Sequence, residues 1–561
     1  MFRRRDPESR TLEKLHFHHC IGNLMTTNTA FADRLESVRS GMAAVHRGGA
    51  NKSIEWKRSQ LKALRRMIIE NKQAILSAIF QDLGKHAIEA EVGEVGTTLI
   101  EIDELLAQLP SYSQPQQVPS PGLLMPAFSE IRYEPLRSPG CLIISPFNYP
   151  INLSLVPVAG SLAAGNPVVL KPSEMASNVS SLLAKLVPRY FDSSVFAIFE
   201  GGIPETTELL RHPWGIVFFT GSSRVGKIVS AQAAQTLTPI ILELGGKSPT
   251  YIAKDCPDMR VVADRIAWGK TVNGGQTCVA PDYVLCHRDV LDQFVDEVKK
   301  SLVRMYGEDS QKSNLTRIIN EDSAKRIIGY IKDIENGGES KGKIIHGGSN
   351  LCDASARFVA PTIILEPSMD TELMKEEIFG PVLPVVPVST DEEAIEFIAK
   401  QQLDMTPLAL YVFTRSSGTF EKVAKSCPSA TLVRNDVIVQ FGTPSLPIGG
   451  LGTSGCGNYH GKHSIESFSH KRATIYKPAT AAFEYGGVRY APYDDWGGLK
   501  GKTFLMLTKL PKIPVMHSRL IGYALLLAFV NALASALFPA EMNEMKENAI
   551  AFLAKVLLVA Q

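Results

Sequence analysis

The chain has 561 residues, of which 45% are hydrophobic and 21% charged, and its 59 basic and 57 acidic residues give a formal net charge of +2. This length accommodates two or three domains with complete hydrophobic cores, and the composition is that of a folded protein. The nearly balanced charge excludes the strongly basic surface that attracts nucleic acid, so we expect no nucleic-acid partner.

Residues 1–30 are predicted to form a disordered N-terminal extension. They lack the apolar core of a secretory signal, and Met25 is an alternative start. The eight cysteines of the chain include no C-x-x-C pair and no Cys/His spacing typical of zinc. This pattern indicates reduced thiols inside a cell and predicts no metal site.

Residues 31–108 are predicted to form long amphipathic helices, because Leu61, Leu64 and Ile68 recur at helical spacing. A proline-rich linker follows. Short apolar runs such as "CLIIS", "PVVLK" and "GIVFFTG" then alternate with segments long enough to be helices. This alternation predicts a doubly wound α/β fold, a parallel sheet with helices on both faces. Ligands of such folds bind beyond the carboxyl ends of the strands.

The stretch "GIVFFTGSSRVGKIV", residues 215–229, is predicted as a strand, a glycine turn and a helix that begins near Val225. The turn could bind a pyrophosphate at the helix N-terminus or simply connect the two elements. Gly221 and Lys227 partly match the phosphate loop of triphosphatases. That loop needs Ser or Thr to bind magnesium where this chain has Ile228, which disfavours a triphosphatase.

Three polar side chains in separate segments have the types needed for nucleophilic catalysis. Cys278 lies in "NGGQTC", Glu243 in "LELGG" and Asn148 in "SPFNYP". At three strand ends, a thiol, a carboxylate and an amide can act as nucleophile, base and oxyanion donor. The alternatives are an inert packed cysteine and a structural carboxylate, for example one paired with Lys247.

Seven motifs make the chain resemble the NAD(P)-dependent aldehyde dehydrogenases, in particular their class 3 or fatty aldehyde dehydrogenase branch. In chain order they are "SPFNYP", "VVLKPSE", "FFTGSSRVGK", "LELGGKSP", "GGQTCVAPDY", "EEIFGPVLP" and "GCGNYHGKHSIESFSHKR". The resemblance runs from about residue 35 to 480. It implies a Rossmann-type NAD-binding domain, an α/β catalytic domain, a small β extension for oligomerisation, and a homodimer.

The same resemblance places the domain boundaries. The expected domains are an NAD(P)-binding domain at 31–243, a catalytic domain at 244–430, and a segment at 431–480 that returns to the first domain and to the β extension. Residues 110–140 would also contribute to the extension, and residues 481–561 would form a C-terminal tail.

The resemblance also assigns the chemistry. Cys278 would attack the aldehyde carbon, the Asn148 amide would hold the oxyanion together with the Cys278 backbone N–H, and Glu243 would activate the water that releases the acid. Two departures, Ile448 and Ile465, stand where the family usually has aromatic side chains. We therefore expect the path of the aldehyde to differ in detail.

The residues that the resemblance assigns to the cofactor are Gly221 and Ser222 at the pyrophosphate, Lys171 and Glu174 at the adenosine ribose, and Glu377 and Phe379 at the nicotinamide ribose. A carboxylate at the 2′ position repels a phosphate, so Glu174 favours NAD without excluding NADP. The alternative for Lys171 and Glu174 is a solvated strand end. Glu376 leaves a second possible register for Glu377.

Residues 521–538, "IGYALLLAFVNALASALF", contain no charge and are about long enough to span a bilayer. Basic residues precede them and acidic residues follow, which would keep the catalytic body on the cytosolic side. The alternative is a buried or interfacial helix.

An anchored enzyme meets aldehydes dissolved in the bilayer, so we expect oxidation of long-chain fatty aldehydes at a membrane. The alternative substrates are an apocarotenal or an aromatic aldehyde. An inactive membrane-attached binding protein is disfavoured because the catalytic trio is complete.

Overall fold

The computed structural model describes residues 29–121, 124, 127–402, 405–479, 489–492, 498, 505 and 508. Residues 1–28 of the predicted extension and the candidate membrane helix 521–538 lie outside these ranges. Among the described residues, no helix is both long and apolar enough to cross a membrane. Two compact units divide the chain: one contains the residues up to Ser113 and Glu134–His470, the other Gln114–Tyr133 and the residues from Lys471 onward.

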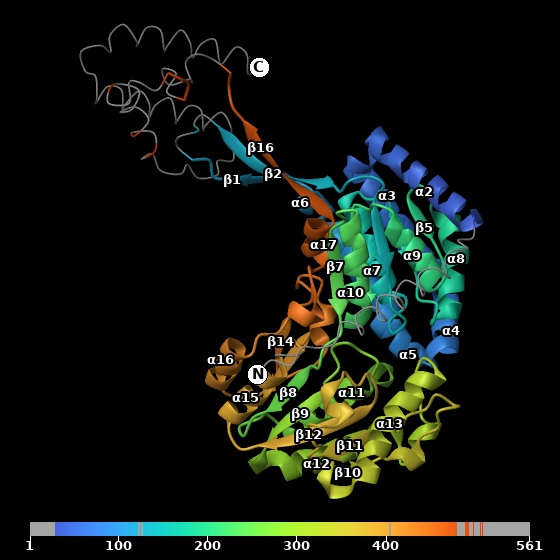
Figure 1. Cartoon of the computed structure of the whole chain (residues 1–561), viewed down its shortest axis with the longest axis vertical. Helices are drawn as coiled ribbons and strands as arrows, with labels where there is room; N and C mark the ends of the chain where they lie inside the picture. Colours follow the sequence, from blue (N-terminus) through green and yellow to red (C-terminus); the bar gives the residue numbers. More distant parts are fainter. Residues whose placement is uncertain are drawn as a thin grey trace, which may run out of the picture. The chain divides into compact units, whose positions relative to one another are not determined.

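The first sheet contains six strands in the order β15-β7-β6-β3-β4-β5, of which β7 and β5 are labelled in Figure 1. Its strands are β3 (Cys141–Ile144), β4 (Val168–Lys171), β5 (Phe196–Ile198), β6 (Ile216–Gly221), β7 (Ile240–Leu244) and β15 (Gly455–Cys456). All pairings are parallel except that of β15 with β7. The predicted parallel sheet is therefore confirmed.

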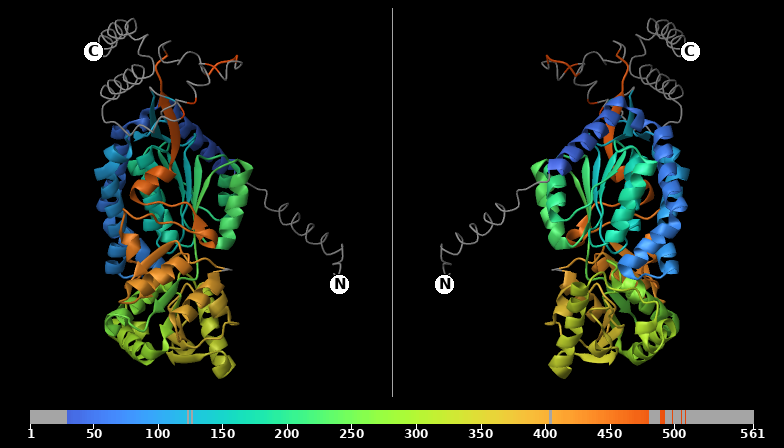
Figure 2. Two further views of the ribbon diagram at one scale, coloured as in Figure 1. Left: turned by 90° about the vertical axis from the view of Figure 1, so that its left-hand side faces the viewer. Right: turned by 90° about the vertical axis from the view of Figure 1, so that its right-hand side faces the viewer.

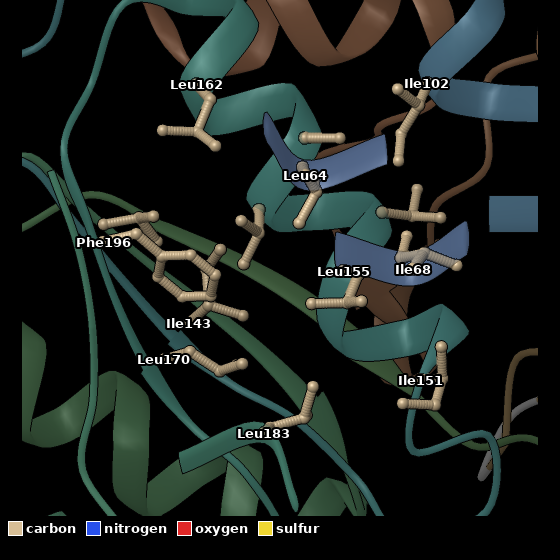
Figure 3. Close-up of a cluster of buried hydrophobic side chains, with 14 of the residues drawn as sticks. Leu64, Ile68, Ile102, Ile143, Ile151, Leu155, Leu162, Leu170, Leu183 and Phe196 are labelled. Atoms are coloured by element: carbon tan, nitrogen blue, oxygen red, sulfur yellow. The ribbon is translucent and has the colours of Figure 1, made fainter. Parts of the chain in front are cut away.

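Helices cover both faces of this sheet (Figure 2). They are α2 (Thr29–Gly48), α3 (Ile54–Glu70), α4 (Lys72–Leu83), α6 (Thr97–Tyr112), α7 (Asn152–Ala164), α8 (Ser177–Tyr190), α9 (Ile203–Arg211), α10 (Ser223–Gln235) and α17 (Gly461–Ser467). Successive strand residues point to opposite faces. Ile143 thus packs with Leu64 and Leu155 in the cluster of Figure 3, whereas Leu142 packs with Leu35 of α2.

The second sheet contains seven strands in the order β10-β11-β12-β9-β8-β13-β14. Their bounds are β8 (Pro249–Ile252), β9 (Tyr283–His287), β10 (Lys343–His346), β11 (Thr362–Leu365), β12 (Val382–Val388), β13 (Ala409–Phe413) and β14 (Thr431–Arg434). Only β10 pairs antiparallel. The helices packed with it are α11 (Met259–Thr271), α12 (Arg288–Tyr306), α13 (Glu321–Gly337), α15 (Asp391–Gln402) and α16 (Ser417–Ser426).

A third sheet joins β1 (Gln116–Val118), β2 (Phe128–Pro135) and β16 (Ser469–Tyr476). Glu130 binds both Arg132 and the Tyr476 hydroxyl, so side chains as well as backbone connect β2 to β16. Its strands come from the two segments predicted to form the β extension. Its role in oligomerisation and the domain boundaries drawn from the sequence stay predictions.

Short elements fill the connections. They are α5 (Ala87–Ala90), the π-helix η2 (Glu91–Gly96), α14 (Glu372–Lys375), and the 3-10 turns η1 (Ala50–Lys52), η4 (Val272–Gly275), η5 (Ser310–Lys312), η6 (Gly338–Ser340), η7 (Ser349–Leu351), η8 (Val439–Gly442) and η9 (Gly452–Ser454). The π-helix η2 is the least regular part of the N-terminal helices. Such turns occur often at functional sites.

Candidate active site

The candidate site residues lie where parallel strands of the first sheet end. Asn148 follows β3, Lys171 ends β4, Gly221 ends β6, and Glu243 lies near the end of β7. These four strands are neighbours, and the sheet grows in opposite directions from β3, toward β4 and toward β6. Ligands of doubly wound sheets bind at such a switch point. The sheet order therefore brings together the motifs that the sequence identified.

Asn148 is directly connected to the loop that carries Cys278. Its side chain is 2% exposed, and its Nδ2 donates to the Gln276 carbonyl at 3.0 Å. Asn273 Nδ2 donates to the Asn148 carbonyl at 2.8 Å and to the Gln276 carbonyl at 3.0 Å. A Cβ on Gly275, whose φ is +75°, would lie 2.4 Å from the Gly380 backbone. The two glycines before the cysteine thus let this loop pack tightly.

Cys278 lies in a turn just after η4 and is partly buried. Burial raises the pKa of its thiol, and the nearby carboxylates of Glu377 and Glu243 raise it further. The thiol is therefore protonated at neutral pH in this structure. A positive charge brought close to it would lower its pKa and favour the thiolate.

Glu243 is 4% exposed, and its Oε1 has no hydrogen-bond partner among the described residues. Burial raises the pKa of this carboxyl well above its usual range. Lys247 is not its partner, because Lys247 Nζ lies 2.6 Å from Asp282 Oδ2 and also donates to two backbone carbonyls. Lys247 is therefore engaged elsewhere and does not pair with Glu243. A buried and unpaired carboxyl beside a thiol is typical of a catalytic site.

Glu377 is a second carboxyl close to Cys278. A Cβ on Gly245 would lie 2.0 Å from Glu377 Oε2, and the Gly246 N–H donates to the Glu377 carboxylate. Burial raises the pKa of Glu377 to about 8, and the charge of Asp282 adds to this effect. The Glu377 carboxyl thus packs directly against Gly245 and Gly246 of "LELGGK", where a side chain at position 245 would clash with it.

The neighbouring residues of the "EEIFGP" motif have separate contacts. Glu376 accepts a hydrogen bond from the Tyr330 hydroxyl at 2.9 Å. Phe379, with φ +52°, has its ring centroid 5.9 Å from that of Phe147 in an edge-on arrangement. Glu376 and Glu377 thus have different surroundings, and the register predicted for Glu377 and Phe379 stays a prediction.

The residues at the other strand ends fit a dinucleotide. Lys171 is buried and pairs with Glu174, which is half exposed. Ser222 caps α10 by accepting a bond from Val225 N, and a Cβ on Gly221 would lie 2.6 Å from the Phe219 ring. The turn after β6 thus leaves backbone N–H groups at a helix N-terminus, which suits a pyrophosphate.

The model of the aldehyde dehydrogenase family matches residues 22–474. The chain belongs to the aldehyde dehydrogenase family. It is 44% identical over 430 residues to the rat "Aldehyde dehydrogenase, dimeric NADP-preferring", covering 76% of this chain and 91% of that protein. It is 41% identical over 498 residues to "Aldehyde dehydrogenase family 3 member A2" of Pongo abelii, covering 88% and 97%.

The solved structures agree with the fold of this aldehyde dehydrogenase. The substrate-bound state of Staphylococcus aureus AldH superposes with a TM-score of 0.78 at 35% identity, covering 85% of this chain and 99% of that chain. The resemblance to the class 3 branch is confirmed by the family 3 relatives. The chain is thus an NAD(P)-dependent enzyme that oxidises an aldehyde to a carboxylic acid, and the triphosphatase interpretation of residues 215–229 is wrong.

Several contacts of the aldehyde dehydrogenase site were not predicted from its sequence. The Tyr149 hydroxyl lies 2.9 Å from Thr277 Oγ1, next to Cys278, and the position of Tyr149 in "SPFNYP" was an available signal. Ile448 and Ile465, the departures from the family pattern, are 0% and 1% exposed in the core of the first sheet. Their influence on the path of the aldehyde stays a prediction.

Proposed function

We propose that this aldehyde dehydrogenase oxidises long-chain fatty aldehydes at a membrane, with Cys278, Asn148 and Glu243 as its catalytic residues. The supporting observation for the residues is that Asn148 and Glu243 lie at the ends of nearby strands of one sheet, that Glu243 Oε1 has no hydrogen-bond partner among the described residues, and that the Asn148 amide binds the loop of Cys278. An apocarotenal or an aromatic aldehyde is the alternative substrate. The catalytic body would face the cytosol.

In the first half of the reaction, the Cys278 thiolate forms a bond to the aldehyde carbon, and the carbonyl electron pair moves to oxygen. The Asn148 amide and the Cys278 backbone N–H donate to this oxyanion. Bound NAD(P) supplies an acceptor for the aldehyde hydrogen, which leaves with its electron pair as hydride. The carbonyl re-forms as a thioester on Cys278.

In the second half, Glu243 removes a proton from water, and the resulting hydroxide attacks the thioester carbon. The carbon–sulfur bond breaks, the carboxylic acid leaves, and Cys278 returns as the thiolate. Burial suits Glu243 to this role because its raised pKa makes it a stronger base than an exposed glutamate. The carboxyl lies close enough to Cys278 to influence the pKa of the thiol.

Residues 521–538 support the choice of an apolar substrate and of a membrane. Lys509, Lys512 and Arg519 precede them and Glu541, Glu544 and Glu547 follow. A chain ended after Leu520 should leave the membrane fraction on carbonate extraction, whereas the full chain should stay.

Each further buried methylene contributes about 0.8 kcal/mol, so hexadecanal should exceed benzaldehyde in kcat/KM by at least about tenfold. NADH absorbance in detergent measures this ratio.

Two outcomes would contradict this proposal. A full-length active enzyme released by carbonate would remove the membrane assignment, and a higher kcat/KM for benzaldehyde would remove the long-chain substrate. An apocarotenal is assayed in parallel as the alternative. Sedimentation of the same preparation tests the proposed homodimer, which the name of the dimeric rat relative supports.

We further propose that Lys171, Glu174, Gly221, Ser222, Glu377 and Phe379 bind the cofactor, with NAD preferred and NADP possible. Burial raises the pKa of Glu377 to about 8, so its carboxyl is neutral below that pH and charged above it. A charged acceptor binds ribose hydroxyls more strongly than a neutral one by about 1 kcal/mol. The Kd for NAD should therefore fall about fivefold as pH rises through about 8, as titration calorimetry would measure.

Glu377→Gln should abolish this pH dependence. The variant is needed because burial also lowers the pKa of Lys270 to about 8. Lys270 and Glu377 therefore titrate in the same pH range, and both lie near Asp282 and Lys247. Glu376→Gln is the matched control and should keep the wild-type profile, since Glu376 contacts Tyr330 instead. If the pH dependence of the Kd for NAD is lost in Glu376→Gln and kept in Glu377→Gln, then Glu376 and not Glu377 binds the ribose.

A further inference from the structure

Lys85 and Glu94 form an ion pair inside the N-terminal helices that none of the chemistry above uses. Both side chains are 0% exposed, and Lys85 Nζ lies 2.6 Å from Glu94 Oε1. Lys85 lies between α4 and α5, and Glu94 lies within the π-helix η2. Burying two charges has a desolvation cost that their attraction barely offsets, so such a pair is weak evidence for stability. Its contacts indicate another role.

The pair holds the loop that carries Asn148. Lys85 Nζ donates to the Asn148 carbonyl at 3.3 Å and lies 4.4 Å from the centre of the Tyr149 ring. Glu94 Oε2 accepts a hydrogen bond from Ile151 N at 2.8 Å. One buried pair therefore contacts three of the four residues from 148 to 151.

The same loop in turn holds the loop of Cys278. Asn148 Nδ2 donates to the Gln276 carbonyl at 3.0 Å, and the Tyr149 hydroxyl contacts Thr277 Oγ1 at 2.9 Å. An amide nitrogen has two N–H donors. One donor of Asn148 is used on Gln276, which leaves the second for an oxyanion formed at Cys278.

The backbone around Glu94 is built to hold this carboxylate in place. Glu94 is one of the two buried residues of η2, and Thr98 Oγ1 donates to the Glu94 carbonyl at 2.6 Å. Thr97 Oγ1 donates to the Gly93 carbonyl at 3.0 Å. The turn that carries Glu94 is thus stabilised, and Glu89 of the preceding α5 separately contacts the Cys278 loop by accepting from Asn273 N at 2.9 Å.

We propose that Lys85 and Glu94 are positioning residues for aldehyde oxidation, which act by fixing the 148–151 loop so that the free N–H of Asn148 points at the oxyanion. This inference rests on the oxyanion role proposed for Asn148. A small displacement of a catalytic group lowers the rate strongly, whereas substrate affinity depends on other contacts.

The test replaces both charges of the pair together, because removal of one alone leaves the other buried without its partner. Glu89, which also lies near Lys85, keeps its hydrogen bonds from Asn273 N and Thr316 Oγ1. Lys85→Met with Glu94→Gln keeps the side-chain volumes, and the Gln oxygen can still accept from Ile151 N. In the full-length enzyme with NAD and benzaldehyde, kcat should fall about 10- to 100-fold while KM and the Kd for NAD change less than about threefold. The matched control, Lys72→Met with Glu91→Gln, removes a half-exposed pair on the same helices and should keep the wild-type kcat.

A double-mutant cycle with Asn148→Ala separates positioning from a purely structural role. If the pair acts through Asn148, its replacement in the Asn148→Ala background should lower kcat by less than about twofold further. An equal loss in both backgrounds, or a wild-type kcat for the Lys85/Glu94 variant, would overturn this inference alone. An Asn148→Ala enzyme with wild-type kcat would instead overturn the oxyanion role itself.

Lys85→Arg covers the case in which the uncharged pair fails to fold. It keeps the ion pair with Glu94 but replaces a compact ammonium with a planar fork, which disturbs the contact with the Asn148 carbonyl. Its kcat should fall at unchanged KM, and only in enzymes that retain Asn148. An unchanged kcat for Lys85→Arg would count against the inference.

Discussion

Replacement of Cys278 by alanine should reduce aldehyde oxidation to the background of the assay and leave NAD binding unchanged. Hydride leaves readily only from a tetrahedral carbon that carries an oxyanion, and without the sulfur no such carbon forms. Loss of a catalytic nucleophile lowers kcat by several orders of magnitude, here at least about 10⁴-fold. NADH absorbance measures the activity, and fluorescence titration measures the affinity for NAD.

Cys456→Ala is a suitable control, because Cys456 is exposed in β15 and its thiol is absent from the proposed mechanism. It should behave as the wild type. Substantial activity in the Cys278→Ala enzyme would mean that another group attacks the aldehyde. Loss of NAD binding in that variant would instead indicate that the loop after η4 has collapsed, and the activity would then say nothing about the nucleophile.

The parallel sheet and the place of its active site could be predicted from the sequence, because both follow from local patterns. Unbroken apolar runs indicate buried parallel strands, and polar residues just after them lie at one edge of the sheet. Asn148 and Glu243 were predicted in this way. Their meeting with Cys278, whose turn lies between η4 and β9 of the second sheet, was suggested by the three residue types and assigned by the family resemblance.

Contacts between residues far apart in the chain were not predictable in this way. Nothing in "LELGGK" indicates that Gly245 is required because Glu377 packs on it. The partner of Lys247 proved to be Asp282, since a lysine can pair with any acid that the fold brings near.

The role of Lys85 and Glu94 was equally hidden. Charged residues among helices are usually solvated, and helical periodicity contains no signal for the π-turn in which the buried Glu94 lies. The burial of Ile448 and Ile465 was also unexpected, because the family pattern had suggested side chains that line the path of the substrate.

Glu243→Gln should separate the two halves of the reaction. Thioester formation needs Cys278 and Asn148, so about one equivalent of NADH per active site should still form rapidly. Water then has no base, and the steady-state kcat should fall about 10²- to 10⁴-fold. Burial raises the pKa of Glu243 well above its usual range, so the wild-type kcat should rise with pH as this carboxyl ionises. The variant should lose that rise.

Hydroxylamine distinguishes this interpretation from a general loss of activity. It attacks thioesters without help from a base, so it should restore turnover to Glu243→Gln and leave Cys278→Ala inactive. Mass spectrometry of the variant after the burst should find the acyl group on Cys278. If Glu243→Gln shows no burst and hydroxylamine restores nothing, the carboxyl is needed before the thioester forms. The proton on Cys278, whose pKa burial raises, would then be the one that Glu243 accepts.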